Sequence, residues 1–470
     1  MKKMFFVLLL LSICSIAPAR TVKGTVVCGK EKLSGVVVTD GTNFTMTGKK
    51  GQFSFEIEDD ADFVYIVTPS GYTADWSKGV PAFFQKADKD EFTFELMKTK
   101  SPEVYNIIAV GEGTATITVS SADDPTKKDT IEVTVIPLND MAKHGAELEG
   151  VVVGVALGDV CYDVLPLQIR WKEEIVRTGF PFYPAVGNHD HDQAYKTEGE
   201  AISSFRTNLC PENYAVFLGD DVLMVLDNII YNGRSNYKEG YSEYVLDWVK
   251  GLMNYVSEDA EIYVAQHSPL NGRNYGKMTI GHQEMLDILK GHKVSFISGH
   301  NHTHGNFEYA EGVREHNVAA ICGTWWDAYH CTDGSPRGFK VFTMKDDHLT
   351  WYYKAIGKDR NFQFEIFPIG TGRLNPESLV VNVWDYDPCW RVEWYQDGTY
   401  MGIVKKVKEY SPLHTAEMEE RYQGRKISEY KRTRVADHYF AITPAADASE
   451  VEVKVTDRFG NVFREKVSLK

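Results

Sequence analysis

The sequence predicts an α/β fold flanked on both sides by β-rich domains. In the middle of the chain, short apolar runs repeatedly end in polar side chains of the kinds that bind metals, a pattern typical of strands in an open α/β sheet. Towards both ends, short β-branched runs alternate with turn residues, which is typical of β-sandwiches. We therefore expect three folded parts and a functional site in the central one.

The N-terminus has the pattern of an export signal. A basic start at Met1–Lys3 precedes an apolar run from Met4 to Ile13 and the small-residue sequence Ala17–Pro18–Ala19, where cleavage is expected. We expect residues 1–19 to be a signal peptide and the protein to be exported to the periplasm, the medium or the cell surface. Cys14 leaves lipoprotein processing as a minority alternative, disfavoured by the bulky Ile13. We expect no transmembrane segment, because this apolar run is too short for a permanent anchor and none elsewhere is longer.

Residues 20–98 predict a small β-domain. The β-branched run Gly35–Thr39 and the alternating run Phe53–Ile57 are separated by turn residues at Asp40–Gly41 and Lys49–Gly51. This arrangement resembles a transthyretin-like or carboxypeptidase-regulatory-like sandwich.

The central part contains four clusters of polar residues, each preceded by a predicted strand. Parallel strands end at the same edge of a sheet, so side chains that follow them gather in one place. The clusters are Gly158–Asp159 with Asp163 after Val151–Leu157, Gly187–Asp190 after Phe182–Val186, His267 after Glu261–Ala265, and Gly299–His302 after Val294–Ile297. Four such coincidences favour a common site.

The residue types in these clusters suit a site for two divalent metals. Two ions a few ångströms apart need a bridging carboxylate, for which Asp159 is the candidate, together with imidazole and amide-oxygen ligands. Each cluster alone has a simpler interpretation: Gly158–Asp159 as a turn, Asn188–His189 as a polar loop, His267 as a hydrogen-bonded histidine. His300 and His302 are more specific, since residues two apart in an extended segment point the same way.

These motifs resemble the calcineurin-like metallophosphoesterase family, whose motifs run Asp-x-His, Gly-Asp-x-x-Asp, Gly-Asn-His-Asp/Glu, His and Gly-His-x-His. The last four read here as GDVCYD, GNHD, the His of AQHSP, and GHNH. The resemblance implies a calcineurin-like four-layer α/β sandwich over residues 99–358. It also extends to a secreted bacterial branch with β-domains on both sides, which has a segment similar to Cys322–Trp326.

The resemblance assigns roles to individual residues. Asp159 would bridge the metals, and Asn188, His267 and His300 would complete one of them, whereas His302 would bind the other. His189 would be the acid/base residue and Asp190 would orient it. The cofactors would be one or two divalent ions, with Mn, Zn or Fe as the candidates. Trp325 and Trp326, which follow the last motif, are candidates for walls of the substrate cleft, although packing explains them equally well.

The first family motif is missing. The predicted strand Tyr105–Val110 runs into Gly111–Glu112–Gly113, with no Asp-x-His pair after it. Instead, Thr114–Val119 and Thr130–Val135 predict a strand, turn and strand, so residues 111–137 resemble the closing hairpin of a bacterial immunoglobulin-like repeat. Glu112 is a weak candidate for a substitute carboxylate. Asp140 and His144 lie one helical turn apart, but ordinary polar residues of a surface helix explain them better.

Residues 359–470 predict a second β-domain. Ser378–Trp384 and the alternating Glu450–Val455 read as strands, and Gln396–Thr399 reads as a hairpin. Trp384, Trp390 and Trp394 are interpreted as core residues rather than a carbohydrate platform.

Composition restricts the partners. The net charge of −15 and the lack of a basic stripe argue against a nucleic-acid partner, so a small phosphoester is the expected substrate class. The cysteines after residue 19 are widely spaced, which leaves one or two disulfides open without assigning them. Oligomeric state is not predicted.

Two hypotheses about function remain open. The first is a metal-dependent phosphoesterase that hydrolyses phosphomonoesters or phosphodiesters with a metal-activated water, with activity reduced by the loss of the first motif. The second is an inactive secreted or surface binding module. Retention of His189, which is no metal ligand in the family pattern, favours the enzyme.

Overall fold

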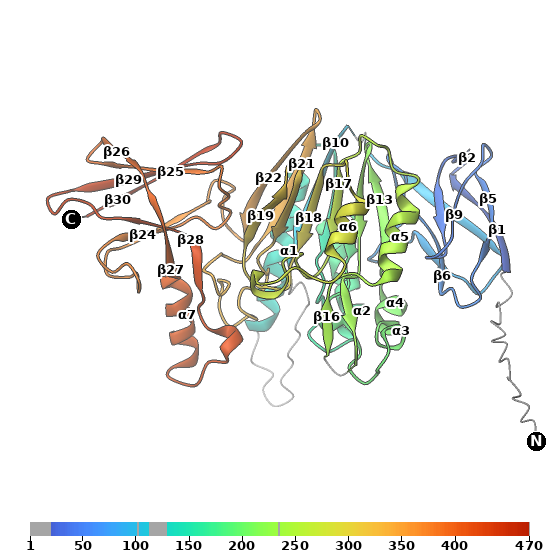
Figure 1. The fold of residues 1–470 in the computed structure, drawn as a ribbon, viewed down its shortest axis with the longest axis horizontal. Coiled ribbons are helices and arrows are strands. Elements are labelled where there is room, and N and C mark those ends of the chain that lie inside the picture. The colour runs from blue at the N-terminus through green and yellow to red at the C-terminus, as the bar shows by residue number, and fades with distance from the viewer. Residues whose placement is uncertain (1–19, 101–102, 112–128, 234–235, 470) are drawn as a thin grey trace, which may run out of the picture.

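The computed structural model describes residues 20–100, 103–111, 129–233 and 236–469. The chain is elongated, with a β-rich part at each end and an α/β part between them (Figure 1). The first and last strands therefore lie at opposite ends of the molecule. No helix among the described residues is long and apolar enough to cross a membrane.

The N-terminal part consists of two β-sheets, as predicted. One has the order β2-β1-β9-β7 with β5 paired to β1, and the other has the order β4-β3-β6-β8. Along β9, Phe92, Phe94 and Leu96 are buried and alternate with exposed residues, as expected where one face of a sheet covers a core. The strands are β1 (Arg20–Cys28), β2 (Glu31–Lys32), β3 (Val37–Thr39), β4 (Phe44–Met46), β5 (Gln52–Ile57), β6 (Phe63–Ile66), β7 (Tyr72–Ala74), β8 (Phe84–Lys86) and β9 (Glu91–Lys98).

The central part contains two sheets. The first has the order β12-β11-β10-β21-β22, in which β10, β11 and β12 are mutually parallel and β21 runs antiparallel to β10 and β22. Its strands are β10 (Val104–Val110), β11 (Val151–Ala156), β12 (Phe182–Pro184), β21 (Gly338–Lys345) and β22 (His348–Ala355). Parallel pairing of β11 with β12 places the first two polar clusters at the same edge.

The second central sheet has the order β13-β14-β17-β18-β20-β19, with β14, β17, β18 and β20 parallel. A separate hairpin joins β15 to β16. The strands are β13 (Tyr214–Leu218), β14 (Asp221–Val225), β15 (Ile229–Tyr231), β16 (Tyr237–Glu239), β17 (Ile262–Ala265), β18 (Val294–Ser298), β19 (Gly305–Ala310) and β20 (Val313–Asn317). Adjacent β17 and β18 likewise bring the third and fourth clusters to one edge.

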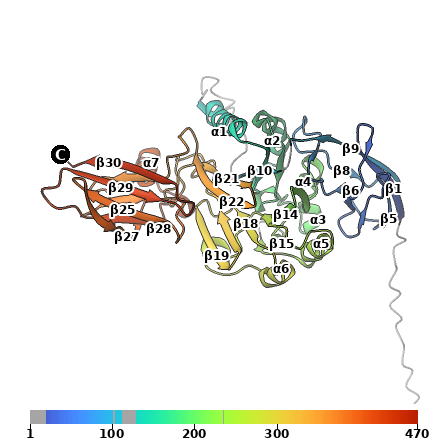
Figure 2. The same cartoon turned by 90° about the horizontal axis from the view of Figure 1, so that it is seen from above.

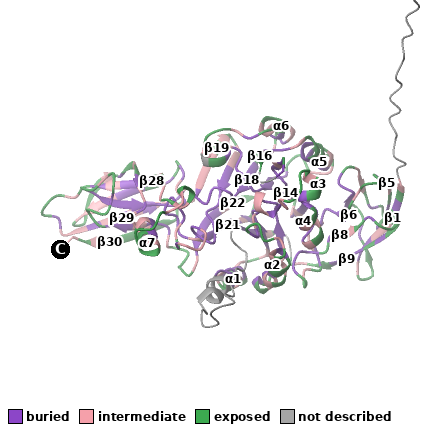
Figure 3. Ribbon diagram, turned by 90° about the horizontal axis from the view of Figure 1, so that it is seen from below, coloured by how far each residue is buried: buried purple, intermediate pink, exposed green. Residues whose placement is uncertain are grey.

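Helices cover the outer faces of the two sheets and complete four layers, as predicted. Figure 2 shows α1 (Asp129–Glu147) and α2 (Leu167–Ile175) outside the first sheet, and α5 (Glu243–Met253) and α6 (His282–Ile288) outside the second. The strands between them are largely buried (Figure 3). Shorter helices are α3 (Glu198–Ala201), α4 (Ser203–Asn208), η1 (Val176–Thr178), η2 (Asn188–Asp190) and η3 (Arg273–Tyr275).

The prediction of a strand at Thr130–Val135 was wrong. These residues lie in helix α1, which precedes β11. The β-branched run favours a strand locally, but β10 and β11 are parallel neighbours and need a long crossover connection, usually a helix. The immunoglobulin-like interpretation of residues 111–137 needed two strands, and the second of them is helical in the structure. Its first, Thr114–Val119, and the candidate ligand Glu112 lie outside the described residues.

Asp140 and His144 lie on α1 and bind the first sheet. Asp140 accepts a hydrogen bond from Nζ of Lys354 at 2.8 Å, and Nε2 of His144 lies 2.6 Å from the hydroxyl of Tyr352. His144 is buried against this sheet. Both side chains dock the helix on β22 and belong to packing, as the simpler interpretation held.

The C-terminal part consists of two four-stranded sheets, β23-β24-β28-β27 and β26-β25-β29-β30. Trp390 is buried in the core between them, Trp394 packs against that core, and Trp384 is buried in the core of the central part, as predicted. Sequence patterns missed helix α7, which begins after Ser411, whose hydroxyl accepts a hydrogen bond from the amide of His414. The elements are β23 (Glu365–Phe367), β24 (Leu379–Asn382), β25 (Arg391–Gln396), β26 (Thr399–Ile403), β27 (Lys405–Tyr410), α7 (Pro412–Tyr422), η4 (Glu429–Lys431), β28 (Val435–Ile442), β29 (Glu450–Thr456) and β30 (Val462–Ser468).

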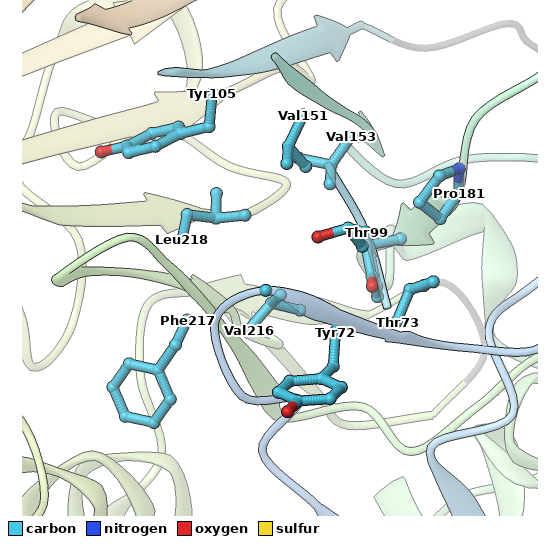
Figure 4. Close-up of a pocket in the computed structure, with 12 residues that line it drawn as sticks. Tyr72, Thr73, Thr99, Tyr105, Val151, Val153, Pro181, Val216, Phe217 and Leu218 are labelled. Atoms are coloured by element: carbon cyan, nitrogen blue, oxygen red, sulfur yellow. The ribbon is translucent and has the colours of Figure 1, made fainter. Parts of the chain in front are cut away.

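The N-terminal part is fixed to the central part by polar and apolar contacts. The buried hydroxyl of Tyr65 donates to the carbonyl of Asn213 at 3.0 Å and accepts from the indole of Trp248 at 2.8 Å. An apolar pocket beside this junction is lined by Tyr72, Val151 and Phe217 among others (Figure 4). No residue of the four polar clusters lines this pocket, so it is separate from the candidate site.

Candidate metal centre

The four polar clusters follow strands of both central sheets and meet where those strands end. Asp159 follows β11, Asn188 follows β12, His267 follows β17 and His300 follows β18. Asp159 and His300 adopt left-handed backbone conformations, with φ of 51° and 67°. Such conformations are costly for residues other than glycine and tend to gather at functional sites.

Polar atoms of three residues converge on Nε2 of His267. Nδ1 of His300 lies 3.0 Å from it, Oδ1 of Asn188 lies 3.1 Å from it, and Oδ2 of Asp159 lies 3.4 Å from it. His267 is fully buried and His300 nearly so. The structure thus brings together the whole ligand set that the resemblance implies for one metal.

In His267 and His300, the ring nitrogen that points away from the other histidine (the far nitrogen) faces a hydrogen-bond acceptor. Nδ1 of His267 lies 2.7 Å from the carbonyl of Leu157, and Nε2 of His300 lies 3.1 Å from Oε1 of Glu239. Because a carbonyl and a carboxylate only accept hydrogen bonds, both far nitrogens carry their protons. Histidines that bind metals are typically oriented in this way by a partner on the other ring nitrogen.

This proton arrangement fits a divalent cation. With both far nitrogens protonated and both rings neutral, as metal binding requires, His267 and His300 direct lone pairs at each other across 3.0 Å. Asn188 and Asp159 add two more acceptor oxygens, so the four atoms repel one another unless a cation lies among them. Two imidazoles, one carboxylate and one amide oxygen suit Zn, Mn or Fe.

The carboxylate of Asp159 is held in its charged form. Burial alone would raise its pKa, but the neighbouring His267 and His189 and the backbone amide of His189, which donates to Oδ1 at 2.8 Å, lower the pKa well below its usual range. Asp159 is therefore ionised and ready to bind a cation.

The loop from Gly187 to Asp190 depends on close packing. A Cβ at Gly187 would lie 2.1 Å from Oδ1 of Asp159, so only glycine allows this approach. Asp190 is fully buried and accepts a hydrogen bond from the amide of Gly187 at 3.0 Å, which closes the loop. Burial and the charge of Asp159 raise the pKa of Asp190 to about 6.

The carboxylate at the ring of His189 is Asp163. Its Oδ1 lies 2.8 Å from Nδ1 of His189, and Tyr162 packs on the same ring with centroids 4.4 Å apart. Asp190, which was expected to orient His189, accepts hydrogen bonds from the amide of Gly187 and the thiol of Cys161, whereas Asp163 is the carboxylate at Nδ1 of His189. The sequence contained a clue, because Asp163 is the second acidic residue of the GDVCYD motif.

His302 lies apart from the convergent group. The Asp159, His267 and His300 cluster has ligand atoms within 4.8 Å of one another, and His302 does not belong to it. Nδ1 of His302 lies 3.4 Å from the carbonyl of Gly323, and its ring stacks on Trp325 at 4.0 Å. The segment that follows Gly111, where the first family motif would lie, is outside the described residues. Of the ligands that the resemblance implies for the other metal, Asp159 and His302 are the ones that the structure describes.

Aromatic side chains stand beside the centre. Trp325 contacts the ring of Tyr430, a residue of the C-terminal part, with centroids 5.0 Å apart. Trp326 is partly buried and packs against the central core. The two tryptophans therefore have different neighbours, since Trp325 contacts His302 and Tyr430. Tyr430 was not predicted, because nothing in the sequence near it indicates a link to the centre. Nζ of Lys431, the next residue, lies 2.6 Å from Oδ2 of Asp327. This ion pair stabilises the contact between the central and C-terminal parts.

The cysteines after residue 19 are all free. Cys161 is buried beside Asp190, with its sulfur 3.5 Å from Oδ1 of that residue. The sequence left one or two disulfides open, and the structure forms none among the described residues.

Comparison with known protein families agrees with this geometry. Residues 136–304 match the calcineurin-like phosphoesterase model, residues 20–99 match the N terminal of calcineurin-like phosphoesterase, and residues 315–463 match the C terminal of calcineurin-like phosphoesterase. The chain belongs to the calcineurin-like phosphoesterase family, a family of metal-dependent phosphoesterases. The resemblance of the motifs to this family is therefore confirmed.

Three solved structures are similar to parts of this chain. A dimetal phosphatase from Danio rerio is 13% identical with a TM-score of 0.38, over 55% of this chain and 97% of its own. A 5'-nucleotidase from Candida albicans is 10% identical with a TM-score of 0.34, over 55% of this chain and 52% of its own. A 5'-nucleotidase precursor from Thermus thermophilus is 12% identical with a TM-score of 0.31, over 54% of both chains. A search of curated proteins found no match.

Proposed function

We propose that this protein is an exported hydrolase that cleaves small phosphomonoesters or phosphodiesters with one firmly bound divalent metal. The observation that supports this most directly is the convergence of Asp159, Asn188 and His300 on Nε2 of His267, next to His189. Export is inferred from the signal pattern of residues 1–19 alone.

A divalent ion at this centre would supply Lewis-acid activation of water and neutralise phosphoryl oxygens. The residues of the chain would do the rest. His189, with Nδ1 directed at Asp163, would use Nε2 to hold or donate the proton of the leaving oxygen. Tyr162, which packs on the His189 ring and is half exposed, would limit the ring's rotation and border the substrate.

We expect slow turnover. Only Asp159 and His302 are available for the other metal among the described residues, and each lost charge-stabilising contact commonly costs about a hundredfold in rate. The competing hypothesis is a binding module without turnover.

Hydrolysis of p-nitrophenyl phosphate and bis-p-nitrophenyl phosphate, with added Mn²⁺ or Zn²⁺, tests the proposal. We expect chelator-sensitive turnover that falls at least about a hundredfold in His189→Ala, as general acid catalysis typically contributes that much. His348→Ala, at an exposed histidine of β22, is the matched control and should match the unmodified protein. Equal turnover in His189→Ala and the unmodified protein would overturn the mechanism, and no turnover in either would favour the binding module. Export is tested by finding the mature N-terminus near Arg20 by mass spectrometry.

A further inference from the structure

A second group of side chains that could hold a metal ion lies beside the Gly187–Asp190 loop. His191 follows this loop directly, Glu198 begins α3, and Asp227 lies between β14 and β15. One ligand atom from each lies within 4.8 Å of those of the other two. None of the three belongs to a family motif read in the sequence.

One ring nitrogen of His191 faces a backbone carbonyl and the other faces a carboxylate. Its Nδ1 lies 2.9 Å from the carbonyl of Gly187, which only accepts, so Nδ1 carries a proton. Nε2 lies 2.9 Å from Oε1 of Glu198, and without a metal a proton lies between these two atoms, because Glu198 and Asp227 outweigh burial and raise the pKa of His191 to about 9. A divalent ion would take the place of this proton. A separation near 3 Å is also what two ligands of one ion show when each lies about 2.1 Å from it. The histidines at the first centre have the same arrangement.

Asp227 adds a buried carboxylate that is only partly satisfied. The side chain is more than nine-tenths buried, and one oxygen accepts a hydrogen bond from the amide of Ile229 at 2.9 Å. Among the described residues, the other oxygen has no hydrogen-bond partner. Burial and the nearby charge of Glu198 raise the pKa of Asp227 to about 8. A divalent cation between the two carboxylates would relieve this repulsion and stabilise both in their charged forms.

The surroundings hold all three side chains in place. Tyr231 stacks on the His191 ring at 4.9 Å and 13°, and its backbone amide donates to the second oxygen of Glu198 at 2.8 Å. The amide of Asp227 donates to Asn213 at 3.0 Å. The side chain of Glu198 is 40% exposed, which gives an ion a route from solvent. This preorganisation is typical of a metal site.

We propose that His191, Glu198 and Asp227 form a second cation site, distinct from the centre at Asp159, that takes a transition-metal ion of the Zn²⁺ or Mn²⁺ class. An imidazole with two carboxylates suits these ions. Through the hydrogen bond from His191 to Gly187, an ion here stabilises the loop that presents Asn188 and His189. The site is a structural support, and its existence does not depend on turnover.

The first test is metal binding by the full-length protein, with Zn²⁺ or Mn²⁺ alone as the probe. Elemental analysis after equilibrium dialysis should show one ion fewer per chain in Asp227→Asn and in Glu198→Gln than in the unmodified protein. Glu200→Gln, an exposed glutamate two residues along α3, is the matched control and should lose none. His267→Ala should lose the ion of the first centre and keep this one. Unchanged metal content in both Asp227→Asn and Glu198→Gln would overturn the proposal.

The second test is independent of any variant that might fail to fold. Crystals soaked in Mn²⁺ should show an anomalous scattering peak about 2.2 Å from Nε2 of His191 and bonded to both carboxylates. A peak at the Asp159 centre with none at His191 would mean that the three side chains form a protonated ion pair instead.

Discussion

Oε1 of Glu239 lies 3.1 Å from Nε2 of His300, on the side of the imidazole that faces away from His267. The other oxygen of Glu239 accepts a hydrogen bond from the amide of Arg273 at 2.8 Å. Burial raises the pKa of this carboxyl, but the hydrogen bonds from His300 and from the amide of Arg273 outweigh burial and lower it overall. Glu239, from the β15-β16 hairpin, thus fixes the orientation of His300, the candidate metal ligand that follows β18.

We predict that Glu239→Gln weakens metal binding by about 10-fold to 100-fold, as is typical when the partner of a ligating histidine is changed. The amide keeps the size of the side chain but removes the charge that holds Nε2 protonated. Isothermal titration with Zn²⁺ measures the effect, with Glu258→Gln, at an exposed glutamate, as the control. An unchanged dissociation constant for the ion of the Asp159 centre would show that Glu239 is not needed to position His300.

Substitutions of Asp163 and Asp190 should have different effects on turnover and on metal binding. Asp163→Asn removes the carboxylate at Nδ1 of His189, so we expect kcat to fall by about a hundredfold, the lower range for general acid catalysis, while metal content stays unchanged. Asp190→Asn disturbs the hydrogen bond that closes the loop, so we expect lower metal occupancy as well. Measurements of turnover and of metal content on the same preparations check both predictions. Loss of metal in Asp163→Asn would contradict the division of roles.

Gly187→Ala should disable the centre by steric overlap. Its φ of −113° is accessible to alanine, so the cost arises from the Cβ that would lie 2.1 Å from Oδ1 of Asp159. Overpacking of this kind costs about 1–3 kcal/mol and displaces the carboxylate. We expect a lower melting temperature and loss of the bound ion. Gly276→Ala, where an added Cβ meets nothing within 4 Å, should change neither.

His414 should make stability depend on pH below neutrality. Its ring is buried between the hydroxyls of Thr324 and Thr433, each 2.8 Å away, and burial lowers its pKa to about 4. The unfolded chain, with a histidine pKa of about 6.5, binds this proton first, so the free energy of unfolding falls as pH drops from 6.5 towards 4, by about 3 kcal/mol in total. His414→Gln should flatten this slope by up to about 1.4 kcal/mol per pH unit in calorimetry, whereas His348→Gln, at an exposed site, should not. Equal slopes in both variants would exclude His414 as the cause.

The sequence predicted the strand-end clusters well, for a physical reason. An apolar run followed by glycine and a ligand is a local signal, and parallel pairing of β11 with β12 and of β17 with β18 then brings the ligands together. Thr130–Val135 was predicted wrongly, because the crossover between β10 and β11 overrides the β-branched preference. Glu239 and Tyr430 were missed because they reach the centre from a hairpin and from the C-terminal part, and no periodic pattern marks such contacts.

The contact between the central and C-terminal parts contains a buried ion pair whose loss should be costly. Oδ1 of Asp385 accepts from Nζ of Lys340 at 2.7 Å and lies 2.8 Å from Nε2 of His304, and all three side chains are fully buried. Burial would raise the pKa of Asp385, but Lys340 and His304 lower it overall, so the carboxylate is charged.

Asp385→Ala leaves the Lys340 ammonium buried without its counter-charge, and we expect a loss of about 3–5 kcal/mol in the free energy of unfolding. Asp437→Ala removes the partner of Lys406 in an exposed pair, 3.2 Å apart, and should cost less than about 1 kcal/mol. Urea unfolding followed by tryptophan fluorescence measures both. The double variant Lys340→Met with Asp385→Leu should recover most of the loss, because replacing a buried pair by apolar side chains is often neutral. A double variant no more stable than Asp385→Ala would mean that lost packing, and not the uncompensated charge, causes the destabilisation.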